Sequence, residues 1–268
     1  MKAALRLHGL HTVCEESKCP NASECFHSGT ATFLILGDRC TRRCAFCAVS
    51  KDIPQPPDPG EPERVAKIAG ELKLRHVVIT SVTRDDLSDG GSSIFAETIL
   101  QVRRTLPESS IEVLIPDFAG SQKDLLTVLD AAPDVLNHNI ETTKELYQVV
   151  RPQADYGRSL ELLSRTSSYK KSLPAGMHMV VKSGLMVGFG ETRDQLSACF
   201  KDLVQAGVEC LTIGQYLRPG RVNISVVKYY TPEEFGELQI EARSAGIPQV
   251  LSAPLVRSSY RAGEMNLK

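Results

Sequence analysis

The chain has 268 residues, a formal net charge of −1, 42% hydrophobic residues and 24% charged residues. These values are ordinary for a globular protein, and the length suffices for one domain of barrel size. The sequence lacks both the basic face that a nucleic-acid partner needs and an apolar run near the ~20 residues of a membrane helix. We therefore expect no nucleic-acid partner and no membrane partner.

Short apolar runs alternate with amphipathic stretches along the chain. In chain order we expect a strand at residues 32–36, a helix at 61–72, a strand at 76–82, a helix at 95–105, a strand at 111–115, a helix at 121–131, a strand at 135–139, helices at 144–150 and 159–166, a strand at 184–188, a helix at 193–206, a strand at 210–216, a helix at 231–245 and a short strand at 249–252. This alternation predicts a parallel sheet with right-handed crossovers.

Six main strands fit an α/β fold of the partial (β/α)6 TIM type, a barrel that is not fully closed. A doubly wound open sheet is the alternative, and either fold puts its active site at the carboxyl ends of the strands. We expect the barrel at residues 31–220. Residues 1–30 would form an amino-terminal segment that carries an auxiliary cluster, and residues 221–268 a carboxy-terminal helix and a tail that caps this cluster.

Eight cysteines are present, and six of them lie between Cys14 and Cys47. A secreted disulfide framework would spread its cysteines more widely. The first ten residues contain no long apolar segment, so we expect no secretory signal. A reducing, cytoplasmic location follows, where clustered cysteines serve as metal ligands or catalytic thiols. Cys199 and Cys210 stand apart from the cluster, and we expect both to be core thiols.

The first motif is C-x3-C-x2-C at Cys40, Cys44 and Cys47, directly after the first predicted main strand. We call these residues the loop trio. Three thiolates can hold three irons of a cubane 4Fe-4S cluster and leave the fourth iron open for a substrate. The alternative is structural zinc, which usually takes four ligands from paired cysteines or histidines.

The loop trio, with Phe46 before its last cysteine, resembles the motif of the radical S-adenosylmethionine superfamily. The resemblance implies that the amino and carboxylate groups of S-adenosylmethionine chelate the open iron. One electron then cleaves the sulfonium and gives a 5′-deoxyadenosyl radical. Residues 184–191 also match the superfamily pattern G-x-[apolar]-x-G-x-x-E, in which glycines let an adenine approach the backbone.

The resemblance also implies the residues that contact S-adenosylmethionine. Asn139 and Glu141 would bind its ribose, and Arg151 its carboxylate, for which a guanidinium is a natural bidentate partner. Gln215 would contact the adenine, with core packing as the alternative. The full expected set is Phe46, Thr80, Ser81, Asn139, Glu141, Arg151, Gly184, Met186, Gly188 and Gln215.

A second motif, C-x4-C-x5-C, precedes the predicted barrel at Cys14, Cys19 and Cys25, which we call the amino-terminal trio. A second 4Fe-4S cluster is the economical interpretation, because chance rarely places three more cysteines beside a cluster motif. Two alternatives stay open. One is a structural zinc completed by His8, His11 or His27, and the other is a set of reactive thiols.

The two trios at this separation resemble the lipoyl synthases, and so do ordered blocks along nearly the whole chain. The matching blocks are residues 12–16, 19–21, 36–38, 80–82, 84–87, 89–91, 137–142, 182–188, 214–216 and 257–260. In that family a serine of the last block is the fourth ligand of the auxiliary cluster. The resemblance carries this role to Ser259, with Ser258 as the second choice. A serine oxygen is a hard donor beside soft thiolates, which would ease loss of that iron.

The resemblance implies lipoyl synthase activity, a sulfur transfer in lipoate biosynthesis. Two sulfur atoms would enter at C6 and C8 of an octanoyl group on a carrier-protein lysine, and the auxiliary cluster would be consumed as their source. Acid–base groups cannot activate such C–H bonds, so no catalytic residue beyond the cluster ligands is expected. Implied partners are octanoylated lipoyl-carrier proteins, either dehydrogenase E2 lipoyl domains or the glycine-cleavage H protein. A one-electron donor such as ferredoxin or flavodoxin is also implied.

The sequence departs from the family in one place. The family usually has His-Leu-Pro-Val where this chain has Asn223-Ile224-Ser225-Val226. If that histidine or proline has a role in the family, another residue must fill this role in the present chain. Two other functions remain as alternatives: a different sulfur-inserting or methylthiolating radical enzyme, against which residues 257–260 argue, and a non-enzymatic iron–sulfur or zinc scaffold protein.

Overall fold

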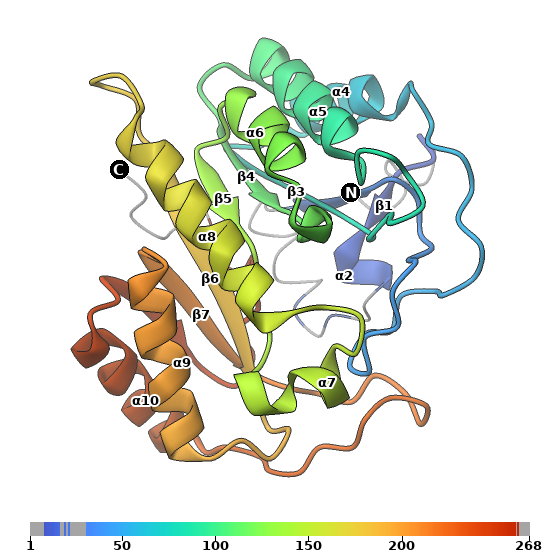
Figure 1. Ribbon diagram of the computed structural model, residues 1–268. Helices are drawn as coiled ribbons and strands as arrows, with labels where there is room; N and C mark the ends of the chain where they lie inside the picture. The colour runs from blue at the N-terminus through green and yellow to red at the C-terminus, as the bar shows by residue number, and fades with distance from the viewer. Residues whose placement is uncertain (1–7, 17–18, 20, 22–30, 261, 263–268) are drawn as a thin grey trace. The chain divides into compact units, whose positions relative to one another are not determined.

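The structure is a computed structural model that describes residues 8–16, 19, 21, 31–260 and 262 (Figure 1). Its elements in chain order are β1 His11–Thr12, α2 Val13–Glu16, β2 Ala31–Ile35, α4 Glu61–Glu71, β3 His76–Ser81, α5 Ser92–Thr105, β4 Ser110–Leu114, η1 Phe118–Gly120, α6 Gln122–Asp130, β5 Val135–Asn137, η2 Lys144–Leu146, α7 Tyr147–Val150, α8 Tyr156–Lys171, β6 Val180–Val187, α9 Arg193–Gln205, β7 Cys210–Gln215, α10 Pro232–Ala245 and β8 Gln249–Ser252.

The described residues form two compact units. Unit 1 holds the residues up to Arg42, Val49–Leu136 and the residues from Ser259 onward. Unit 2 holds Arg43–Ala48 and Asn137–Ser258. The division therefore passes through the loop of the loop trio, between Arg42 and Arg43.

Unit 1 is built on the parallel strands β2, β3 and β4, with β1 antiparallel beside β2. The β3 sequence His-Val-Val-Ile-Thr-Ser contains a continuous run of four β-branched residues, and all of the strand except Ser81 is buried, as expected of a central parallel strand. Helices α4, α5 and α6 pack side by side (Figure 1). The carboxyl ends of β2, β3 and β4 therefore share one edge, where their following loops begin.

Unit 2 contains the parallel strands β6, β7 and β8. Helices α8 and α9 contact one another, and α10 packs on both α9 and β8. The core between helices and strands includes Phe200, Leu203 and Ile213. Cys199 and Cys210 are buried there, and burial raises the pKa of the Cys199 thiol to about 12. The expectation that both are core thiols is confirmed.

Most expected elements are present within a few residues of their predicted ends. Two of these helices begin at capping residues: the Ser121 hydroxyl accepts from the Asp124 N–H, and Thr231 with Glu234 forms a capping box that opens α10. Several features differ from expectation. The strand expected at 184–188 begins earlier, at Val180. The predicted helix at 159–166 extends to Tyr156–Lys171, because Asp155 caps it early, and β5 ends at Asn137. The short elements β1 and α2 lie where the sequence indicates little order.

Among the helices that the structure describes, none has the length and apolar character needed to cross a membrane. The expected boundaries at residues 30 and 220 stay a prediction.

We predict that Gly214→Ala destabilises the protein by about 1–3 kcal/mol, because a Cβ there would lie 2.1 Å from the backbone oxygen of Val256. The matched control is Gly236→Ala on the exposed face of α10, where nothing lies within 4 Å. That change should stabilise by about 0.5–1 kcal/mol, since alanine is the better helix former. Urea unfolding of the apoprotein measures both. Equal effects at the two positions would contradict the described packing of β7.

Candidate active site

The turn from β2 into the cysteine loop is fixed by two charged side chains of unit 1. Leu36 adopts a left-handed backbone with φ of 68°. Its N–H donates to Glu61 Oε2 at 2.8 Å, and its carbonyl accepts from Arg84 Nη1 at 3.2 Å. Burial raises the pKa of Glu61, against the opposing effect of the Leu36 N–H. The chain therefore leaves β2 in one defined direction before it reaches Cys40.

The Cys40 thiol of the loop trio accepts two backbone hydrogen bonds within unit 1. Its Sγ accepts the backbone N–H groups of Arg42 at 3.4 Å and Thr83 at 3.3 Å. Thr41 donates its N–H and its hydroxyl to the carbonyl of Thr83, at 3.0 and 2.9 Å. Hydrogen bonds to a ligand sulfur spread its negative charge and tune the potential of a bound cluster. The geometry at Cys40 therefore fits a thiolate ligand.

Arg42, inside the same motif, forms a buried ion-pair network in unit 1. Its side chain is 5% exposed, and its Nε and Nη2 atoms each donate to Asp85 at 2.8 Å. Nη2 also donates to Asp117 Oδ1 at 2.6 Å, and the Asp117 side chain is fully buried. Burial lowers the pKa of the Arg42 guanidinium, but the hydrogen bonds of both carboxylates outweigh it and hold this pKa above its ordinary value.

Asp117 is presented to Arg42 by a strained turn after β4. Phe118 and Ala119 both have left-handed backbones, with φ of 45° and 51°. The Ala119 N–H donates to Asp117 Oδ1 at 3.1 Å, the same oxygen that Arg42 contacts. Non-glycine residues in this conformation cost about 1–3 kcal/mol each, and they persist where the surroundings hold them. The strain marks this turn as a functional or positioning element.

Cys44 and Cys47 lie in the segment of the loop that belongs to unit 2. The Cys47 N–H donates to the Cys44 carbonyl at 3.2 Å, and the Ala45 N–H to Val150 O at 2.9 Å. The Asn223 amide, 6% exposed, donates from Nδ2 to the carbonyls of Ala45 at 3.1 Å and Cys47 at 3.0 Å. The residue that departs from the family pattern therefore holds the cysteine loop.

Asn139, Glu141 and Arg151 come together in unit 2, as the sequence predicts for residues after the fourth main strand. Arg151 Nη1 donates to the Asn139 carbonyl at 3.1 Å and to the Tyr147 hydroxyl at 2.8 Å, and Asn139 Nδ2 donates to Glu141 Oε1 at 3.1 Å. Glu141 has a left-handed backbone with φ of 67°. Burial raises its pKa, while the Arg151 charge opposes the shift.

One atom in this group points to a ligand. Asn139 Oδ1 is buried and has no hydrogen-bond partner among the described residues. A buried acceptor of this kind costs stability unless something donates to it. A ribose hydroxyl would do so, and therefore the group fits the expected S-adenosylmethionine site. The assignment itself stays a prediction.

Gly184 of β6 and Gly188, directly after this strand, make room for side chains of unit 2. A Cβ on Gly184 would lie 2.5 Å from Asn139 Oδ1, and one on Gly188 would lie 2.3 Å from Gln215 Nε2. Glu191 then accepts the N–H groups of Gly188 and Phe189, at 2.7 and 2.9 Å. These contacts give the two glycines a packing role, and the adenine contact expected from the superfamily pattern stays a prediction.

The other expected contacts of S-adenosylmethionine are placed as follows. Thr80 is buried on β3 and donates its hydroxyl to Leu114 O at 2.9 Å, whereas the Ser81 hydroxyl is buried with no partner among the described residues. Phe46 and Met186 pack on a small apolar cluster of unit 2. Gln215 donates to three carbonyls and accepts the Tyr230 N–H, so its amide fits the packing alternative.

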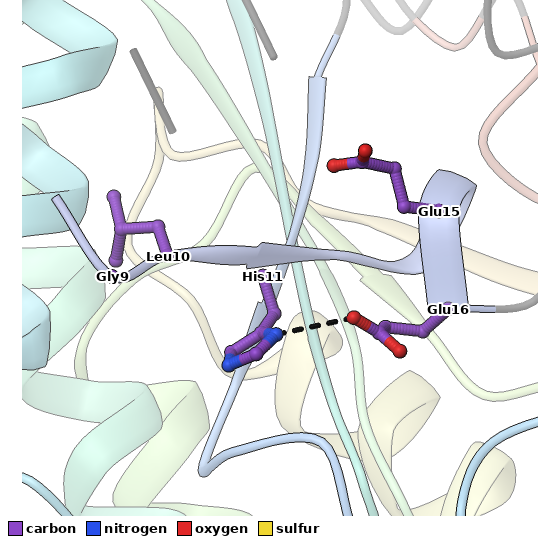
Figure 2. A pocket seen from close by; sticks show the side chains of 5 residues that line it. All are labelled: Gly9, Leu10, His11, Glu15 and Glu16. Carbon is purple, nitrogen blue, oxygen red and sulfur yellow. Dashed lines mark hydrogen bonds and ion pairs between the residues drawn. The ribbon is translucent and has the colours of Figure 1, made fainter. Parts of the chain in front are cut away.

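The amino-terminal trio is described only in part. Cys14 lies on α2, Cys19 is half-buried, and Cys25 falls outside the described residues. Figure 2 shows a pocket of about 270 Å³ beside α2, in which His11 Nδ1 and Glu16 point toward one another at 3.1 Å. Nδ1 of His11 is therefore engaged with a carboxylate, an arrangement that leaves Nε2 able to bind a metal, so the zinc alternative stays open.

Ser259 lies in unit 1 against β2. Its Oγ accepts from the buried Thr32 hydroxyl at 3.0 Å. Thr12, two residues before Cys14, pairs with Phe33 on the same strand. Ser259 and the segment that leads into Cys14 therefore both contact β2.

The described thiols suit iron–sulfur ligation. Cys19, Cys40, Cys44 and Cys47 are half-buried and form no disulfides. In the described part of the chain, no three His, Cys, Asp or Glu side chains are arranged to hold a single metal ion. Half-buried thiols without disulfides are the soft donors that cubane clusters use, and three of these four lie on one short loop.

Sequence reasoning did not identify the network of Arg42, Asp85 and Asp117. Its signal was nevertheless present, because carboxylates that follow neighbouring parallel strands meet at one edge and a motif arginine can reach them. The sequence contains no comparable pattern that would predict the contacts of Asn223 with the cysteine loop.

We predict that Asn223→Ala loosens the segment Arg43–Ala48, because two carbonyls lose their donor at a cost of about 1–3 kcal/mol. Amide hydrogen exchange of this segment in the apoprotein should become faster. The exposed neighbour Ser225→Ala serves as the control and should leave the exchange unchanged. Equal exchange in both variants would mean that Asn223 does not hold the loop.

Comparison with known proteins shows the family. Residues 34–203 match the model of the Radical SAM superfamily. A lipoyl synthase of Symbiobacterium thermophilum is 54% identical over 266 residues, which is 99% of this chain and 81% of that protein. A lipoyl synthase of Caldanaerobacter subterraneus is 50% identical over 262 residues, covering 98% of this chain and 90% of that one.

Solved structures with low sequence identity show the same fold. HydG of Carboxydothermus hydrogenoformans has a TM-score of 0.63 at 15% identity over 82% of this chain. Methylornithine synthase has a TM-score of 0.60 at 14% identity, also over 82%. The chain spans 52% of the first protein and 63% of the second. These likenesses confirm the expected fold, a partial barrel. The sequence relatives and the family model establish that the chain belongs to the lipoyl synthase family of the radical SAM superfamily.

Proposed function

We propose how this member of the lipoyl synthase family inserts two sulfur atoms at C6 and C8 of a protein-bound octanoyl group. The loop trio holds one 4Fe-4S cluster and the amino-terminal trio, with Ser259, holds a second. The observation that carries the proposal is the support of Cys40 Sγ by two backbone N–H groups at the carboxyl edge of β2.

The first cluster, when bound with S-adenosylmethionine, supplies a deoxyadenosyl radical that abstracts hydrogen from the octanoyl chain. This chain's own residues orient the cofactor. Asn139 Oδ1 accepts from a ribose hydroxyl, and Arg151 faces the carboxylate. A fold neighbour, SuiB of Streptococcus suis, has been solved bound to S-adenosylmethionine, with a TM-score of 0.60.

The second cluster is the sulfur source, and Ser259 is its fourth ligand. Thr32 supports this role, because a hydroxyl that donates to Ser259 Oγ favours the alkoxide needed for metal binding. A hard oxygen donor binds iron less firmly than a thiolate does, so Ser259 would hold its iron as the most labile of the cluster and would make the sulfides of the cluster available as the sulfur source. Ser258 is the second choice.

The substrates are octanoylated carrier proteins, either dehydrogenase E2 lipoyl domains or the glycine-cleavage H protein. A one-electron donor such as ferredoxin or flavodoxin reduces the first cluster. We place the reaction in the cytoplasm, since both trios must stay reduced for cluster assembly.

The test is the mass of an octanoyl-lysine peptide after anaerobic turnover with S-adenosylmethionine and dithionite. The amino-terminal cluster is first rebuilt with sulfur-34 sulfide. We expect a product that has gained two heavy sulfurs. We also expect Cys19→Ala to form deoxyadenosine without any sulfur gain, because the loop trio is intact.

Two outcomes would contradict the proposal. Sulfur insertion by Cys19→Ala at the parent's level would remove the amino-terminal trio from the reaction. Absence of deoxyadenosine from the parent protein would favour a scaffold function. A Ser259→Ala variant that loads and turns over like the parent would refute the ligand role of Ser259 alone.

A further inference from the structure

Arg42 joins three parts of unit 1 at one point. It lies two residues after Cys40, and its guanidinium contacts Asp85 in the loop after β3 and Asp117 in the turn after β4. Both carboxylates thus reach the arginine from the ends of neighbouring parallel strands. The side chain of Arg42 is almost fully buried, whereas that of Arg43, the next residue, is exposed.

The contacts of Arg42 define its geometry as well as its charge. Asp85 accepts two parallel N–H groups, an arrangement that a lysine ammonium cannot reproduce. Asp85 also donates its backbone N–H to Thr41 Oγ1 at 3.1 Å, so the network returns to the residue beside Cys40. The strained turn at Phe118 and Ala119 keeps Asp117 in reach. Three independent segments therefore hold one loop conformation.

The same conformation sets the hydrogen bonds to the sulfur. One donor to Cys40 Sγ is the backbone N–H of Arg42 itself, and the other is that of Thr83. Thr83 is tied to the loop through its carbonyl, which accepts from Thr41. A shift of the Arg42 side chain would therefore move both donors relative to the sulfur.

We propose that Arg42, clamped by Asp85 and Asp117, is a positioning residue that orients two N–H donors toward Cys40 Sγ and thereby sets the reduction potential of the cluster at the loop trio. The inference rests on the proposed function, because it requires a cluster at that trio. Donors to a ligand sulfur stabilise the reduced, more negative cluster. Loss of the clamp therefore makes the potential more negative, so that the cluster becomes harder for its electron donor to reduce.

The experiment compares Arg42→Lys and Asp85→Asn with the control Arg43→Lys. All are made in the full chain with the amino-terminal trio replaced by alanine, so that one cluster is measured. Redox titration followed by electron paramagnetic resonance gives the potential. Arg42→Lys keeps the positive charge and loses the two-pronged contact, and we expect it to lower the potential. Asp85→Asn should also lower the potential, because it breaks the two-pronged contact. The negative charge that it removes is partly exposed and screened by solvent, so loss of this charge alone has little effect on the potential.

The outcomes separate positioning from charge. If Asp85→Asn raises the potential and Arg42→Lys leaves it unchanged, the network acts by charge alone and the inference is overturned. The inference is also overturned if the potential is unchanged in both variants, or if the control Arg43→Lys shifts the potential by the same amount. If Arg42→Lys folds by circular dichroism but loads no iron, Arg42 acts on assembly of the cluster and not on its potential, which overturns the inference.

A second measurement applies if Arg42→Lys does not fold. Asp117→Asn keeps an amide oxygen that accepts from Arg42 and Ala119, so it retains the geometry and removes only charge. We expect its potential to stay at or above the parent's, and a fall would contradict the positioning role. A parent protein that assembles no cluster in this background would refute the proposed function itself, and the inference with it.

Discussion

A thiolate that is to bind a cluster must stay reduced, reach its metal and have its charge supported by nearby donors. In this chain the parallel strands of unit 1 meet that requirement. Because β2, β3 and β4 run in one direction, the loops that follow them begin at a common edge. Cys40 follows the first strand, Thr83 and Asp85 the second, and Asp117 the third. The contacts that support Cys40 are therefore consequences of strand direction.

Local patterns in the sequence predict much of this fold. A β-branched run specifies β3, and the caps at Ser121 and Thr231 specify two helix starts, because each signal lies within a few neighbouring residues. Cysteine spacing alone identifies the loop trio. The resemblance supplies the grouping of Asn139 and Arg151, which the structure brings together.

The remaining features depend on contacts between distant residues. The bond between Arg42 and Asp117 spans 75 positions, and the one between Asn223 and Cys47 spans 176, so no local pattern announces either of them. Gly184 shows a related limit: the sequence shows that a side chain is excluded there, but only the structure shows that Asn139 fills the space. Asn223 also shows that a residue at a departure from the family pattern can make a positioning contact.

The central claim is that two separate sets of three thiolates each hold a cubane cluster with a different task. Mössbauer spectroscopy of iron-57 protein, purified without exposure to oxygen, tests this claim most directly. The account predicts about eight irons per chain in two cubanes, with S-adenosylmethionine altering the signal of one iron in one of them. Zinc in place of iron at either set, or about four irons per chain, would contradict it.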